Sequence, residues 1–160
     1  MDSSHPIPTN KMAILPQRLL LFDGVCNLCD RSVQFIIRHD PTGKFKFAAL
    51  QSDYTQSLTE SALKDQLAPL LTLKEVHTKE AQLRTLILIQ QGQVFTRSTA
   101  VIKVLQQLGF PWNLSAIMLI LPKVIRDAIY NYIARHRYKW YGKKERCMVP
   151  TTALKARFME

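Results

Sequence analysis

Two cysteines three positions apart, directly after a short apolar run, restrict the fold of this chain more than any other feature. The run Leu19 to Phe22 leads into the turn pair Asp23-Gly24, and Cys26 and Cys29 follow. A short, continuous apolar run predicts a strand buried on both faces, and the turn delivers the cysteines to the start of a helix. Two thiols at this spacing can meet in a disulfide and pass electrons to other thiols. The pattern therefore predicts a redox pair at a strand-to-helix junction.

The remaining apolar pattern predicts further strands and helices in a definite order. A helical apolar face begins at Cys29 and stops before Pro41, because the residue before a proline disfavours the helical region. The pair Gln91-Gly92 suits a tight hairpin, and Ser98 is placed to cap the helix after it. In chain order we expect strands over residues 19–22, 44–50, 86–89 and 94–96, and helices after Cys29, within 53–75 and over 100–108.

This order, strand, helix, strand, helix, strand, strand, helix, is the minimal one of a thioredoxin-like fold. That fold keeps its redox pair after the first strand, where the cysteines lie here. We therefore predict an α/β protein with a central mixed four-stranded sheet flanked by helices and a C-terminal helical extension. We expect a disordered leader over residues 1–17, a thioredoxin-like core over 18–110 and a basic helical extension, packed on the core, over 111–160.

The apolar runs are too short to cross a bilayer, which takes about 20 residues. The longest is Ala116 to Leu121, and Pro16, Gln17 and Arg18 interrupt any apolar region that a secretory signal would need. Three cysteines are an odd number and too few for a dense disulfide framework. We therefore expect a cytoplasmic protein without a transmembrane segment.

Basic side chains concentrate in the last part of the chain, where residues 101–160 hold 11 Lys and Arg against 3 Asp and Glu. Apolar residues recur at helical spacing there and predict an amphipathic helix over 123–139 whose apolar face packs on the core. That face comprises Val124, Ile125, Ala128, Ile129, Tyr132 and Ile133. The basic residues, Arg137 and Lys139 among them, predict a solvated face. The mixture with Tyr and Trp is compatible with nucleic acid or an anionic membrane surface, and an apolar bend over 112–122 with a membrane or a protein partner.

Several separate segments resemble the DCC family, in the same order along the chain. These are Leu21 to Cys29, Ala49 to Ser52, Thr96 to Ala100, Pro122 to Asp127 and Arg137 to Gly142. The family is named for an Asp and two Cys, which match Asp23, Cys26 and Cys29, and the resemblance covers residues 18–150. It implies a thioredoxin-like thiol-disulfide oxidoreductase, without naming its substrate. Cys147 matches a cysteine often present in the family, and we assign it no catalytic role.

The residues themselves suggest how such an enzyme of the protein-disulfide reductase type would work, without a cofactor. Cys26, at the helix N-terminus, faces unpaired backbone amides that favour the thiolate, so it is the candidate nucleophile. Cys29, one turn further in and more shielded, is the candidate resolving thiol. Asp23 is the third candidate catalytic residue, because it is placed to shuttle the proton that exchange requires. The partner would be a thiol or disulfide of a protein or a small molecule.

Other interpretations of the same residues stay open. The Asp23-Gly24 pair can serve only as a turn and cap, and the cysteines can be inert core residues. A zinc site would need further ligands, for which the chain offers Cys147, His5, His39, His77 and His136. A non-enzymatic module that binds nucleic acid, membrane or protein through the basic helix is the other class. The direction of electron flow is also open, because Asn27-Leu28 differs from the Gly-Pro of thioredoxin and residues 82–85 lack its proline.

Overall fold

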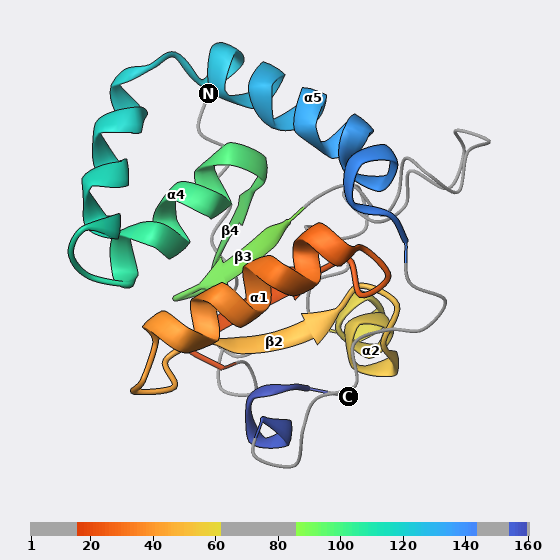
Figure 1. The fold of residues 1–160 in the computed structure, drawn as a ribbon. Helices are drawn as coiled ribbons and strands as arrows, with labels where there is room; N and C mark the ends of the chain where they lie inside the picture. The colour runs from red at the N-terminus through yellow and green to blue at the C-terminus, as the bar shows by residue number, and fades with distance from the viewer. Residues whose placement is uncertain (1–15, 62–85, 144–153, 160) are drawn as a thin grey trace.

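A four-stranded mixed sheet forms the centre of the molecule in the computed structural model, which describes residues 16–61, 86–143 and 154–159 (Figure 1). The strands are β1 (Arg18–Phe22), β2 (Lys46–Ala49), β3 (Ile87–Gln90) and β4 (Gln93–Thr96). They lie in the order β2-β1-β3-β4, with β1 parallel to β2 and antiparallel to β3, and β3 antiparallel to β4. The predicted α/β fold with a mixed, thioredoxin-like sheet is therefore confirmed.

Helices follow the strands in the predicted order and continue into a C-terminal region. They are α1 (Asn27–His39), α2 (Asp53–Ser61), α4 (Arg97–Gln107), the 3-10 helix η3 (Trp112–Ile120), α5 (Lys123–Tyr141) and the short η4 (Lys155–Arg157). The helix predicted within 53–75 is described as far as Ser61, and the rest of that prediction lies outside the described residues. So do residues 1–15, and the division into leader, core and extension stays a prediction.

The two faces of the sheet bury different sets of side chains, as the period of two along a strand requires. Leu20 and Phe22 of β1 pack with α1 and α4 on one face, in a cluster that includes Val33 and Val104. Leu19 and Leu21 point to the other face and pack with Leu58 of α2. All four β1 residues from Leu19 to Phe22 are at most 1 % exposed. The continuous apolar run was thus a correct sign of a strand covered on both sides, and it holds the following turn in a fixed position.

The hairpin between β3 and β4 forms where the sequence predicts it. Gln91 and Gly92 both have positive φ angles, 49° and 74°, as a two-residue turn of this twist requires. The predicted cap of the next helix is wrong, however. Helix α4 begins at Arg97 with Thr96 as its N-cap residue, and no side chain caps it. Ser98 lies inside the first turn, where its hydroxyl donates a hydrogen bond to the Asp127 carboxylate of α5 instead.

Helix α5 packs against α1 and α4, but through a different face from the predicted one. Val124 is 80 % exposed and Ile129 54 %, whereas Ala134 and Arg137 are buried. The reason is that the polar side chains of α5 find buried partners. Ser98 donates to Asp127, and the backbone N–H of Leu86 donates to the Tyr130 hydroxyl over 2.8 Å. No helix in the described part of the chain is long and apolar enough to cross a bilayer.

Candidate active site

The end of β1 and the start of α1 bring the three predicted site residues together. Asp23 follows the last residue of β1 and is 2 % exposed. Cys26 has extended backbone angles and is the N-cap residue of α1, and Cys29 lies in the first turn of that helix. Both cysteines are free thiols. The strand-to-helix turn therefore places two thiols and a carboxylate at one end of the sheet.

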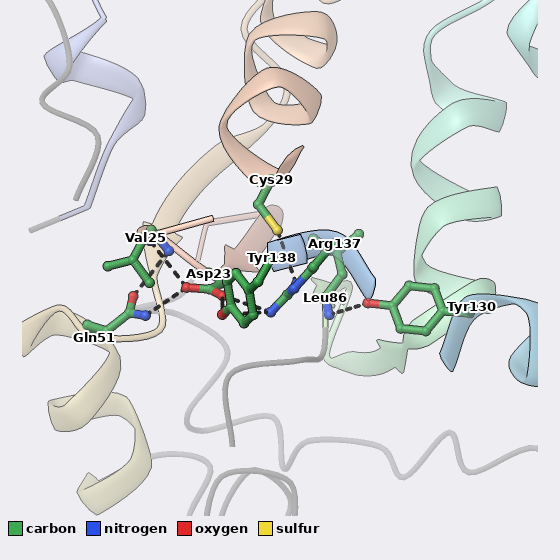
Figure 2. A network of polar contacts seen from close by, with 9 residues as sticks. Asp23, Val25, Cys29, Gln51, Leu86, Tyr130, Arg137 and Tyr138 are labelled. Carbon is green, nitrogen blue, oxygen red and sulfur yellow. Dashed lines mark hydrogen bonds and ion pairs between the residues drawn. The ribbon is translucent and has the colours of Figure 1, made fainter. Parts of the chain in front are cut away.

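A buried ion pair joins this turn to α5 (Figure 2). One Nη atom of Arg137 donates to an Asp23 carboxylate oxygen over 2.7 Å, and the side chains of the pair are 5 % and 1 % exposed. The other Nη atom donates to the sulfur of Cys29 over 3.2 Å. Because a buried charge is costly unless it is paired, Asp23 and Arg137 need each other. Arg137 thus places a positive charge from α5 next to the Cys29 sulfur.

Further donors hold the Asp23 carboxylate in place. The Tyr138 hydroxyl donates to the oxygen that accepts from Arg137. The other oxygen accepts from the Gln51 side chain over 3.0 Å and from the backbone N–H of Val25 over 3.2 Å. Burial, with the bond to Asp23 acting in the same direction, raises the pKa of Tyr138, so its phenol keeps its proton and acts as a donor. Asp23 therefore has two roles. It stabilises the turn after β1 by accepting from the Val25 N–H, and it forms an ion pair with Arg137 beside the thiols.

The two thiols have opposite shifts in pKa. A hydrogen bond from the Cys29 thiol is the largest cause that lowers the pKa of Cys26, from 9.0 to about 6; burial opposes it, while the Cys29 and Leu28 amides and Arg137 add to it. The same hydrogen bond, followed by burial, raises the pKa of Cys29, although Arg137 acts against this. Arg137 contacts Cys29 directly, but Cys26 also has the amides of the helix N-terminus, so the negative charge settles on Cys26.

The exposure of the two thiols differs from the expectation that Cys29 is the more shielded. Cys26 is 0 % exposed, whereas Cys29 is half-buried. The end of α5 covers Cys26, since Cys26 and Lys143 form an isolated antiparallel bridge and the Asn27 side chain donates to the Tyr141 carbonyl over 2.7 Å. Cys26 is therefore closed off from solvent in this structure.

Cys29 lines an apolar cavity of about 450 Å³ between α1, α4 and α5. Its walls include Val33 and Phe35 of α1, Val101 and Leu105 of α4, Ile133 and Ala134 of α5, and its polar part includes Arg137. The volume falls in the range of small-molecule sites, which are about 300–1,000 Å³. The cavity is therefore a space in which an apolar group can lie beside Cys29.

The other candidate residues are not brought to this site. His39 and His136 each bond the backbone carbonyl four residues earlier, on α1 and α5 respectively. His5, His77 and Cys147 lie outside the described residues. Within the described residues, no three His, Cys, Asp or Glu side chains gather as a metal site would require.

Sequence reasoning missed Arg137, Tyr138 and Gln51 as site residues. Arg137 was assigned to a solvated basic face, which is wrong, because it is 4 % exposed and paired with Asp23. A signal was present: Tyr130, Ala134 and Arg137 follow each other at intervals of four and three, so they share a helical face. All three missed residues also lie in or beside the segments that resemble the DCC family.

Comparisons with known proteins show the family to which the chain belongs. The model of a family described as DCC1-like thiol-disulfide oxidoreductase matches residues 20–143. The chain is 44 % identical over 145 residues to the uncharacterized protein YuxK of Bacillus subtilis, covering 91 % of this chain and 96 % of that one. It is 29 % identical over 130 residues to a chloroplastic DCC family protein of Arabidopsis thaliana, covering 81 % and 67 %. No solved structure matches. The chain belongs to the DCC1-like thiol-disulfide oxidoreductase family.

Proposed function

We propose that this protein is a thiol-disulfide oxidoreductase whose Cys26 and Cys29 cycle between dithiol and disulfide. The observation that carries the proposal is the position of both thiols at the N-terminus of α1, beside the buried Asp23–Arg137 ion pair, and the opposite pKa shifts of the two thiols agree with it. A thiolate is the nucleophile in exchange, and the best attacking thiol has a pKa near the ambient pH. Cys26 meets this condition, so we assign it as the nucleophile and Cys29 as the resolving thiol.

The proposed cycle balances electrons within the thiols. The Cys26 thiolate attacks a substrate disulfide, forms a mixed disulfide and releases one substrate thiolate. Cys29 then loses its proton and attacks Cys26, which forms the Cys26–Cys29 disulfide and releases the second substrate thiol. The substrate gains two electrons and the protein loses two, which an external dithiol returns.

Asp23 and Arg137 would both act in the step in which Cys29 resolves the mixed disulfide. Arg137 lies 3.2 Å from the Cys29 sulfur, so its charge stabilises the thiolate that Cys29 becomes when it resolves the mixed disulfide. Asp23 holds Arg137 in that position through the 2.7 Å ion pair. The sequence suggested Asp23 as the proton shuttle, and we retain it as the candidate that receives the Cys29 proton, because its carboxylate and the Cys29 sulfur contact the same Arg137 guanidinium.

The charge on Cys26 gives a first test. In the reduced wild-type protein, the absorbance of the Cys26 thiolate should rise with pH through a midpoint near 6, far below the ordinary 9.0. Subtracting the absorbance of the Cys26→Ser variant isolates the contribution of Cys26. Cys29→Ala removes the strongest cause of the shift and should move the midpoint up, whereas Cys29→Ser keeps a hydroxyl donor and should move it less. A midpoint at the ordinary value in the wild type, or equal midpoints in both Cys29 variants, would contradict the assignment.

The cavity beside Cys29 suggests a preference among substrates. Its apolar walls should favour a disulfide that carries an apolar group next to sulfur, by roughly tenfold in kcat/KM for dipropyl disulfide over bis(hydroxyethyl) disulfide. Val101→Phe narrows the cavity and should remove this preference while the polar disulfide is still reduced. Val124→Phe, at a position 80 % exposed, is the matched control and should change neither rate. Equal rates for both disulfides in the wild type would rule out the cavity as a substrate site.

The cytoplasm is the compartment that suits this proposal. A dithiol that donates electrons must be kept reduced, and cytosolic thiols are kept reduced by thioredoxin and glutathione. The odd number of cysteines also argues against a stapled extracellular framework. Selective alkylation in intact cells would check this, since the pair should be recovered mainly as thiols; recovery mainly as a disulfide would argue for an oxidising compartment.

A further inference from the structure

The outer surface of η3 and α5 is apolar over both elements. Every large apolar side chain that is exposed among the described residues comes from positions 110–141. We call this region the η3–α5 surface; its most exposed members include Leu114, Ile117 and Ile120 from η3, and Val124, Ile125 and Ile129 from α5. Monomeric soluble proteins rarely expose large contiguous apolar patches unless the patch binds something. Apart from Ile133, which lines the cavity beside Cys29, the redox site does not use these side chains, so they call for a separate explanation.

The geometry of η3 produces one row of this surface. Side chains three residues apart line up along a 3-10 helix, so Leu114, Ile117 and Ile120 share one edge. They are 54 %, 61 % and 81 % exposed. The helix as a whole packs on α4, and α5 lies beside α4 as well, so both form an outer layer in Figure 1. The exposed side chains of η3 and those on the outward face of α5 thus lie on two elements that follow each other directly in the chain.

Exposed basic side chains are interspersed with these apolar residues along the sequence, almost without acidic ones. Lys123, Arg135, Lys139 and Lys143 are exposed, whereas Asp127 is the one acidic residue between positions 109 and 143. Asp127 is turned inward and accepts a hydrogen bond from Ser98. Trp140 and Tyr132 are also more than half exposed, and such aromatic residues favour the boundary between water and lipid. The composition of the surface therefore matches an anionic, apolar partner.

We propose that the η3–α5 surface binds peripherally to an anionic lipid bilayer. A helix with exposed apolar residues flanked by Lys and Arg lies in the membrane interface, where both the buried area and the attraction to anionic lipids contribute. A second copy of the chain is the main alternative occupant. A symmetric dimer through this surface would bring its Lys and Arg residues close to the Lys and Arg residues of the partner, and these like charges would repel. Charge complementarity therefore favours the bilayer.

Sedimentation with lipid vesicles tests this proposal on the full chain. We expect binding to vesicles of equal parts phosphatidylglycerol and phosphatidylcholine, weaker binding to pure phosphatidylcholine, and weaker binding as salt rises. Arg135→Gln with Lys139→Gln should weaken binding to the anionic vesicles by about fivefold per side chain removed. Arg38→Gln with Lys44→Gln removes the same charge from exposed positions outside the surface and should weaken binding much less.

The apolar contribution has its own variant. Ile117→Ser with Ile120→Ser should weaken binding at least tenfold while the unfolding midpoint stays unchanged, because both side chains are exposed. Equal effects of the two charge variants, or no binding to anionic vesicles by the folded wild type, would overturn the proposal. So would a stable dimer at micromolar concentration that the Ile117→Ser, Ile120→Ser variant dissociates, since the surface would then join two copies.

Discussion

Replacing Cys26 with Ser is expected to reduce the rate of disulfide reduction to that of the reaction without protein. The hydroxyl of Ser cannot form the mixed disulfide that the proposed cycle requires. Cys29→Ser should also stop turnover, but for another reason. It leaves the Cys26 nucleophile and removes the resolving thiol, so a mixed disulfide should accumulate on Cys26.

Reaction of the pre-reduced protein with an excess of substrate disulfide and no external dithiol, followed by mass spectrometry of the trapped protein, separates these outcomes. Cys147→Ser is the matched control, because we assign that thiol no part in the cycle, and it should retain the wild-type rate. A mixed disulfide that accumulates on Cys29 in the Cys26→Ser variant would exchange the two roles. This outcome is informative because Cys29 is the more exposed thiol and lines the cavity. Full activity of Cys26→Ser would contradict the mechanism altogether.

Replacing Arg137 with Met is expected to lower the free energy of unfolding by about 3–5 kcal/mol, which is the usual cost of leaving a buried charge without its partner. The variant keeps the long apolar part of the side chain but leaves the Asp23 carboxylate, 1 % exposed, without a cation. Urea unfolding of the reduced protein measures this loss. The double variant with Asp23→Asn removes both charges and should recover part of it, which a double-mutant cycle quantifies.

The matched control is Arg135→Met, two positions earlier on the same helix. Arg135 is exposed, so its replacement should change the free energy of unfolding by no more than about 0.5 kcal/mol. Similar losses for the two variants would show that the ion pair contributes little to stability. Arg137→Met should also raise the pKa of Cys26, because the guanidinium is among the causes that lower it.

The sheet and the helices around it could be predicted because their signals are local. Leu19 to Phe22 is apolar at every position and is buried on both faces, and Gln91-Gly92 has the conformations that a tight hairpin needs. The junction that holds Cys26 follows directly from these elements. Such elements can be predicted from the sequence because their conformation depends on neighbouring residues and not on distant ones.

The parts that failed depend on contacts between distant segments. Helix α5 shows an apolar stripe that predicts packing, yet the face it turns inward carries Asp127, Tyr130 and Arg137. Each of these is held by a residue far away in the sequence, as Arg137 is by Asp23. The cap predicted at Ser98 failed for the same reason, because its hydrogen bond to Asp127 depends on a residue far away in the sequence. A polar side chain on a buried helix face thus indicates a candidate site, which the spacing of apolar residues alone does not predict.

The redox equilibrium of the Cys26–Cys29 pair tests the central claim most directly. The protein would be equilibrated in buffers of graded glutathione or dithiothreitol ratio, its thiols blocked by alkylation, and the state of the pair read by mass spectrometry. We predict a single reversible two-electron transition between dithiol and Cys26–Cys29 disulfide, whose midpoint also tells whether the protein donates or accepts electrons. If no Cys26–Cys29 disulfide forms at any ratio while the protein stays folded, the pair is not a redox centre and the proposed function is wrong.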